Sequence, residues 1–186
     1  MNVETTALPG VLRIQTDIYE DDRGGFMETF HADRYAEMGI DVTFVQDNVS
    51  RSETGVLRGL HLQHPHPQGK LVYVLSGTVY DVVVDVRPNS DTFGEWIGTT
   101  LQAWSHQLFV PEGFAHGFVV TDGPATFAYK CTDVYAPEAE LTIHWNDPDL
   151  GIDWPVDDPV VSEKDAAAPR LRDVDRDRLP RVRSIV

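Results

Sequence analysis

Short runs in which apolar and polar residues alternate dominate the chain, and this period of two predicts β-strands rather than helices. In the run 79–86, Tyr80 and three valines fall on one side, whereas Asp81 and Asp85 fall on the other. The runs 71–75 and 79–86 flank Ser76-Gly77-Thr78, which predicts a hairpin. Further strands are expected at 11–18, 25–29, 44–50, 96–101, 107–110, 117–121, 126–132 and 142–145, and a short helix at 32–38.

Turn-forming residues separate these strands, at 88–91, 122–124 and 147–148. Many short strands at this spacing indicate an antiparallel sandwich or jelly roll. A chain of 186 residues that is 41% hydrophobic suits a single domain, 1–186, and we find no internal repeat or linker. The charged end, 173–186, is expected to be a flexible tail.

The composition is strongly acidic. Thirty acidic residues against 15 Lys and Arg give a net charge of -15, which disfavours binding to nucleic acid or to an anionic membrane. The few lysines favour a protein that works at high salt; an ordinary acidic cytoplasmic protein is the alternative. No apolar run approaches the roughly 20 residues of a membrane span, and the N-terminus lacks signal-peptide features, so we expect a cytoplasmic protein. The single cysteine, Cys131, is expected to be a small buried strand residue.

Two spaced motifs resemble the metal-binding motifs of cupins. In the first, Gly55, five residues and His61-Leu62-Gln63 are followed by Lys70 and Gly77; the second is Pro111-Glu112-Gly113-Phe114-Ala115-His116. The four ligand positions therefore hold His61, Gln63, Lys70 and His116. Because a protonated ammonium cannot bind a metal and repels a divalent cation, we expect no metal here. A histidine base beside a cation suits proton abstraction next to a carbonyl group.

Around these motifs, five segments resemble the dTDP-4-dehydrorhamnose 3,5-epimerase family in the same order: 22–28, 44–48, 55–63, 68–72 and 111–118. The resemblance reaches about 164–166 and fades in the last dozen residues. It implies an all-β, cupin-type antiparallel jelly roll, or double-stranded β-helix, with short peripheral helices. It also implies a homodimer that epimerises C3 and C5 of dTDP-4-dehydro-6-deoxy-D-glucose to dTDP-4-dehydro-L-rhamnose, in dTDP-L-rhamnose biosynthesis.

The chemistry of such an epimerase assigns roles to four residues. His61 is the natural base, because an imidazole has an ordinary pKa of about 6.5, and Lys70 is the natural electrophile at the C4 oxygen. The family match assigns Asp165 to a position behind His61, and Tyr129 to protonation from the far face. No cofactor is expected, because the ketone of the substrate is itself the electron sink.

Other residues match family positions that bind the nucleotide sugar. In this family the nucleotide site borders the subunit interface, so some of them could serve the neighbouring chain's site. The matched positions are Arg23, Phe26, Glu28, Gln46, Asp47, Asn48, Arg58, Gln63, His116, Tyr135, Glu140 and Lys164. An arginine suits a diphosphate because its planar group donates two parallel hydrogen bonds.

Each assignment also has a purely structural interpretation. His61 alone would fit a core histidine, Lys70 a solvated edge-strand lysine and Tyr129 a core aromatic residue. Asp165 alone would fit a helix cap or a loop acid. Arg58 and Glu28 would fit surface ion pairs.

The sharpest rival for the motif is a metal site made of His61, His64 and His66. Against it, Pro65 and Pro67 stiffen the segment, and strand geometry points His61 and His64 to opposite faces. For the function, two alternatives remain open: an epimerase that inverts only C3 or only C5 of a related nucleotide keto-sugar, and a non-catalytic cupin that binds a nucleotide sugar.

Overall fold

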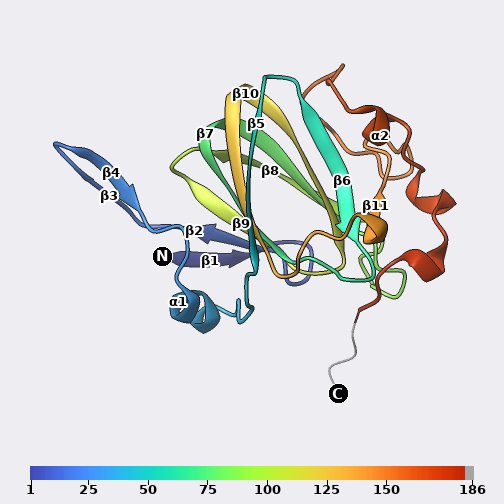
Figure 1. Ribbon diagram of the computed structural model, residues 1–186, viewed down its shortest axis with the longest axis horizontal. Helices are drawn as coiled ribbons and strands as arrows, with labels where there is room; N and C mark the ends of the chain where they lie inside the picture. The colour runs from blue at the N-terminus through green and yellow to red at the C-terminus, as the bar shows by residue number, and fades with distance from the viewer. Residues whose placement is uncertain (183–186) are drawn as a thin grey trace.

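Antiparallel strands are the main regular structure of the protein in the computed structural model, which describes residues 1–182 (Figure 1). The strands are β1 (Asn2–Thr5), β2 (Leu12–Gln15), β3 (Ile18–Asp21), β4 (Gly24–Met27), β5 (Gln46–Ser52), β6 (Leu57–Gln63), β7 (Lys70–Asp85), β8 (Trp96–Gln102), β9 (His106–Val110), β10 (Phe114–Cys131) and β11 (Glu140–Thr142). The helices are α1 (Ala32–Glu37) and α2 (Glu163–Ala166), with 3₁₀ turns at Pro137–Ala139, Leu171–Asp173 and Arg176–Arg178.

One large sheet forms the body of the molecule, in the order β1-β2-β9-β7-β10-β6-β11, with β5 added to β10 and β8 added to β7. Its centre is the pairing of the two longest strands, β7 and β10, which extends from Phe114 opposite Asp85 to Cys131 opposite Lys70. The sheet curls into a barrel-like jelly roll (Figure 1). The all-β, cupin-type fold and the short peripheral helices expected from the sequence are therefore confirmed.

The expected hairpin at Ser76-Gly77-Thr78 is wrong, because β7 runs through it without a turn. The expected turn at 122–124 likewise lies inside β10, where the pairing with β7 shifts register. A Cβ on Gly77 would lie 2.7 Å from the carbonyl oxygen of Asp122, and Gly77 has a φ of +78°. Glycine is needed here because the two long strands bend closely past each other. The turn signals in the sequence mark this bend.

Other differences concern strand boundaries. The expected strand 11–18 is divided into β2 and β3, and the expected strands 117–121 and 126–132 are two parts of β10. The sequence pattern missed β1 and did not identify β6 as a strand. The expected helix at 32–38 is confirmed as α1.

Both faces of β7 are buried, which explains its nearly continuous run of valines. On one face Val79 and Val83 pack with Leu101, Leu108 and residues of β10. On the other face Val82, Val84 and Val86 pack against segments that follow β11. Cys131 is fully buried in β10 with a free thiol, as expected.

The C-terminal part of the chain covers the second of these faces. Trp154, Leu171 and Leu179 pack on β6, β7 and β10, and Leu179 is only 2% exposed. The Val182 backbone also exchanges two hydrogen bonds with the Asn89 side chain. Leu179 and Val182 thus attach this segment to the rest of the protein. The flexibility expected for 173–186 stays a prediction, and residues 183–186 lie outside the described residues.

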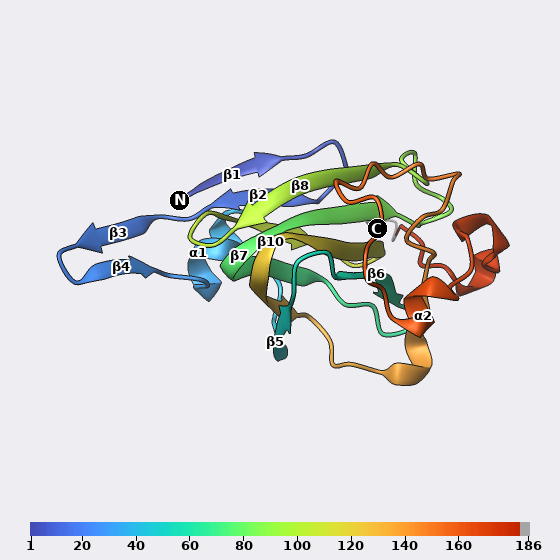
Figure 2. The same cartoon turned by 90° about the horizontal axis from the view of Figure 1, so that it is seen from above.

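The strands β3 and β4 form a separate two-stranded sheet that projects from the barrel, away from the end that carries α2 (Figures 1 and 2). At this hairpin Tyr19 and Phe26 are 61% and 64% exposed, and their ring centroids are 6.5 Å apart. Within 1–182, none of the helices is both long and apolar enough to cross a membrane.

Candidate active site

A cavity of about 210 Å³ lies where β5, β6, β7 and β10 come together. It is lined by Ser50, Arg58, His61, Lys70, His116, Phe118, Phe127 and Tyr129. Phe118 and Phe127 form its apolar wall and stack on each other with ring centroids 4.2 Å apart. Three of the four expected catalytic residues thus share one small cavity, and the fourth, Asp165, contacts it through His61.

His61 stands on β6 with a carboxylate behind its ring. Its Nε2 lies 2.7 Å from Oδ1 of Asp165, which is 3% exposed at the start of α2. The Gly59 N–H also donates to Asp165, and Ser162 caps the helix by accepting from the Asp165 N–H. Burial acts to raise the pKa of Asp165, but the hydrogen bond and charge of His61 hold that pKa below its usual value. Asp165 is therefore a carboxylate that can fix the tautomer of His61 and stabilise its protonated form.

Lys70 is placed at the first residue of β7, opposite Cys131 of β10. Burial lowers the pKa of Lys70, while Cys131, Asp81 and Glu140 act in the opposite direction. A desolvated ammonium group in an apolar cavity interacts strongly with any negative charge that develops nearby. Lys70 is thus suited to stabilising an enolate oxygen.

Tyr129 lies on β10, opposite Val72 of β7 and Asn48 of β5. Burial raises the pKa of Tyr129, and Cys131 acts in the same direction. The phenol therefore stays protonated at neutral pH and has a proton to donate.

His116 is the direct register partner of His61 across β6 and β10. Its Nε2 lies 2.9 and 3.0 Å from the two oxygens of Asp81, a carboxylate with no exposed surface. Burial raises the pKa of Asp81, against the opposing effects of His116 and Lys70. The sequence placed Asp81 on the face of β7 opposite Tyr80 and three valines but gave it no role. The fully buried carboxylate is acceptable there because His116 Nε2 lies within hydrogen-bond distance of both its oxygens.

Ser50 is a second residue that sequence reasoning missed. It lines the cavity, and its hydroxyl is buried without a hydrogen-bond partner among residues 1–182. Nothing in the sequence separates Ser50 from Ser52, the other serine of β5. Its place at the cavity follows from its register opposite Phe127, which only the structure shows.

A second group of expected residues surrounds Tyr135 and β5, outside the cavity lining. The Tyr135 hydroxyl donates to Glu140 at 3.0 Å, and Lys164 pairs with the same carboxylate at 2.8 Å. Asp47 pairs with Lys130, and Gln46 donates to Asn48. Arg58 lines the cavity and uses its Nε to bond Ser52.

Four more expected binding residues also lie outside the cavity lining. Arg23 pairs with Asp21 and Phe26 contacts Tyr19, both on the projecting hairpin, while Glu28 just after it pairs with Arg34. Gln63 is 4% exposed, and its amide is engaged by backbone groups of neighbouring loops.

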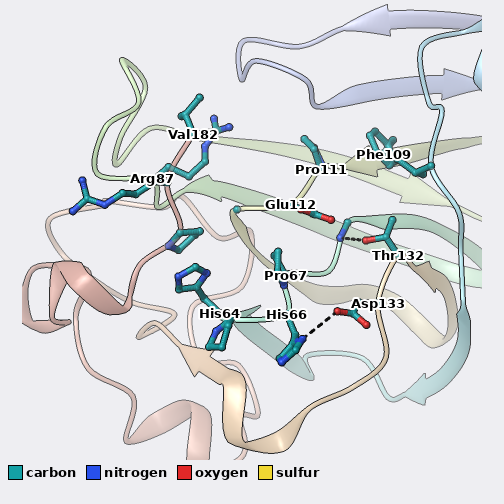
Figure 3. Close-up of a pocket in the computed structure, with 16 residues that line it drawn as sticks. His64, His66, Pro67, Arg87, Phe109, Pro111, Glu112, Thr132, Asp133 and Val182 are labelled. Atoms are coloured by element: carbon teal, nitrogen blue, oxygen red, sulfur yellow. Dashed lines mark hydrogen bonds and ion pairs between the residues drawn. The ribbon is translucent and has the colours of Figure 1, made fainter. Parts of the chain in front are cut away.

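Within 1–182, the structure does not gather His61, His64 and His66, the rival metal ligands, into a group that could hold a metal ion. His64 and His66 line a different cavity of about 890 Å³, between the loop at 64–67 and the C-terminal segment (Figure 3). There His66 lies 3.6 Å from Asp133.

Comparison with known proteins identifies one family. A family model described as dTDP-4-dehydrorhamnose 3,5-epimerase matches residues 5–173. The dTDP-4-dehydrorhamnose 3,5-epimerase of Methanothermobacter thermautotrophicus is 51% identical over 90% of this chain and 93% of its own length. The one from Pseudomonas aeruginosa is 49% identical over 94% of this chain and 98% of its own length.

Solved structures are similar to this chain as well. The dTDP-6-deoxy-D-glucose-3,5-epimerase of Legionella pneumophila, in complex with dTDP-4-keto-L-rhamnose, is 51% identical with a TM-score of 0.96, covering 98% of this chain and 99% of that one. A 3'-monoepimerase from Streptomyces bikiniensis, in complex with dTDP-quinovose, is 35% identical with a TM-score of 0.89, covering 95% and 91%. The chain therefore belongs to the dTDP-4-dehydrorhamnose 3,5-epimerase family.

Proposed function

We propose that this protein epimerises dTDP-4-dehydro-6-deoxy-D-glucose at C3 and C5 to dTDP-4-dehydro-L-rhamnose, without a cofactor, in the synthesis of dTDP-L-rhamnose in the cytoplasm. The observation that carries the proposal is the 2.7 Å contact of His61 with Asp165 in a cavity shared with Lys70 and Tyr129. The free, buried Cys131 fits a reducing compartment.

In the proposed mechanism His61 removes the proton from a carbon next to the C4 ketone, and Asp165 stabilises the resulting imidazolium. The electrons move onto the C4 oxygen, where the Lys70 ammonium stabilises the enolate. Tyr129, which a different strand supplies, returns a proton to the other face of the carbon. The same steps serve C3 and C5, because both carbons adjoin the ketone.

For the binding of the dTDP portion, we assign Arg58 and His116 at the cavity, and Gln46, Asp47, Asn48, Tyr135, Glu140 and Lys164 around it. The local cations matter because the protein carries a net charge of -15, which repels a diphosphate at long range.

A homodimer forms part of the proposal. Arg23, whose side chain is 89% exposed, and Phe26 lie on a hairpin that projects from the barrel (Figure 2). A two-stranded hairpin with exposed aromatic rings is marginally stable alone and gains by packing on another surface. We assign the hairpin, with Glu28 beside it, to the active site of the neighbouring subunit.

The dimer is tested by mixing two inactive variants, Arg23→Ala and His61→Ala, after partial unfolding and refolding together. In a mixed dimer, the chain with intact His61 receives the intact Arg23 of its partner. The mixture should recover up to about one quarter of wild-type activity, because half the dimers are mixed and each has one complete site. No recovery, with mixed dimers shown by mass spectrometry, would place Arg23 outside the partner's site.

The reaction is tested with purified protein and dTDP-4-dehydro-6-deoxy-D-glucose in deuterated water. NMR should show deuterium at both C3 and C5 and the L-rhamno product. The similarity to a 3'-monoepimerase supports one alternative, inversion at a single carbon of a related nucleotide keto-sugar. Inversion confined to C3 would establish that alternative. Binding of the nucleotide sugar without deuterium exchange at either carbon would show that the protein is a non-catalytic binding protein.

A further inference from the structure

The segment 133–136, between β10 and the 3₁₀ turn before β11, is irregular, yet glutamine side chains hold the backbone of all four residues. Gln68 Nε2 donates to the carbonyl of Asp133 at 2.8 Å. Gln63 Nε2 donates to the carbonyl of Val134 at 3.2 Å, and its Oε1 accepts from the N–H of Ala136 at 2.9 Å. Gln46 Oε1 accepts from the N–H of Tyr135 at 2.8 Å. Side chains from β5, β6 and the loop before β7 thus replace the water that usually satisfies a surface loop.

Gln63 is the central member of this group, which we call the glutamine brace (Gln46, Gln63 and Gln68). It is 4% exposed, and Nε2 also donates to the carbonyl of His66 at 2.8 Å. Its amide therefore ties the loop at 64–67 to the segment 133–136. Figure 3 shows the same two segments joined again by the ion pair of His66 with Asp133. Next to these segments, the Gly69 N–H donates to the Thr132 hydroxyl.

The segment carries Tyr135, which the brace binds through its backbone N–H. Tyr135 is 52% exposed, and its hydroxyl bonds Glu140, which also pairs with Lys164 next to Asp165. Glu140 stands opposite Gln63 in the pairing of β11 with β6, two residues from the partner of His61. Tyr135 is therefore held beside the catalytic residues by its backbone on one side and by its hydroxyl on the other.

We propose that the glutamine brace positions Tyr135 for contact with the nucleotide-sugar substrate, so that Gln63 acts on substrate binding through the backbone and without touching the substrate. This inference rests on the proposed function. Gln63 and Gln68 are therefore positioning residues. Both polar atoms of the buried Gln63 amide are bonded to backbone groups, which leaves none for the substrate. The aromatic ring of Tyr135, in contrast, is half exposed and available for contact. Preordering such a ring removes the entropy cost of fixing it on binding.

The test uses three substitutions of similar size. Gln63→Met removes three hydrogen bonds of the brace, and Gln68→Met removes one at its edge. Gln102→Met, at an exposed end of β8, is the control. We expect KM to rise roughly tenfold for Gln63→Met and roughly threefold for Gln68→Met, with kcat within about twofold of wild type and no change in the control. A fall in kcat at constant KM would overturn the proposal.

Hydrogen exchange supplies a second readout that needs no substrate. In Gln63→Met the amide of Ala136 should exchange faster, while amides in the centre of β7 keep their protection. An unchanged exchange rate of the Ala136 amide would contradict the proposal that Gln63 holds this segment. If the wild-type protein proved inactive as an epimerase, the proposed function would fail, but this measurement would still decide whether the brace exists.

A double substitution shows whether Gln63 acts through Tyr135. Tyr135→Ala should raise KM by itself, and Gln63→Met in that background should raise it little further, because the ring to be positioned is gone. Independent, multiplying effects on KM, or a Tyr135→Ala variant with normal KM, would contradict the proposal.

Discussion

His61 and His116 are direct register partners across β6 and β10, and each imidazole is bonded to a buried carboxylate. The two pairs differ in their carboxylates: the pKa of Asp165 lies below its usual value and that of Asp81 above. Like groups with different environments commonly take different roles in one site. We therefore expect the pair of His61 with Asp165 to act in proton transfer, and the pair of His116 with Asp81 to set the charge around Lys70.

Replacing Asp165 by asparagine should test the first role. Asp165→Asn keeps the shape of the side chain but can hold His61 in the wrong tautomer, so kcat should fall by about 10²–10⁴-fold. Deuterium wash-in should slow equally at C3 and C5, because one base serves both. Thermal unfolding measured alongside separates this effect from loss of the fold. Slowing at only one carbon would mean that a second base acts at the other.

The pH dependence of kcat should report the second role. Protonated Lys70 is the active form, and burial lowers its pKa, so activity should decline on the alkaline side before an ordinary lysine would lose its proton. Asp81 acts to raise the pKa of Lys70. Asp81→Asn removes that charge while retaining an acceptor for His116, and the alkaline limb should therefore move to lower pH. Asp149→Asn, at an exposed loop acid paired with Arg172, is the control and should leave the limb in place.

The sequence predicted the fold class from local periodicity, and a motif with fixed spacing singled out His61 and Lys70, whereas Tyr129 and Asp165 were proposed from the family resemblance alone. His61 and Lys70 follow from one stretch of chain. Asp165 lies 104 residues from His61, and only the family resemblance connected them.

What the sequence could not predict depends on contacts between distant strands. Gln63 sits two residues from His61 on β6, yet its amide bonds backbone groups 71 and 73 residues away rather than reaching the cavity. Likewise, Gly77 signals a turn in the sequence, but close packing on β10 makes it part of a bend. Local propensity cannot distinguish these outcomes, since tertiary packing decides them.

Chelation should leave the enzyme active. Lys70 stands where the cupin motif has a metal ligand, and a protonated ammonium repels a divalent cation. After prolonged incubation with a chelator and gel filtration, kcat and KM should match those of untreated protein. Activity that is lost on chelation and restored by one particular metal, bound stoichiometrically, would contradict this expectation.

Replacing Tyr129 by phenylalanine should separate removal of the proton from its return. The ring and its packing against Phe127 are retained, so the fold should be unaffected, while the only proton that the side chain can donate is lost. His61, Asp165 and Lys70 remain to form the enolate, and exchange of the carbon-bound proton with deuterated water should continue. Inversion at C5 should fail, because no acid returns the proton to the other face. Wash-in and product stereochemistry are read by NMR from one sample: normal inversion at both carbons would remove Tyr129 from the mechanism, and loss of exchange together with inversion would show that it helps to form the enolate.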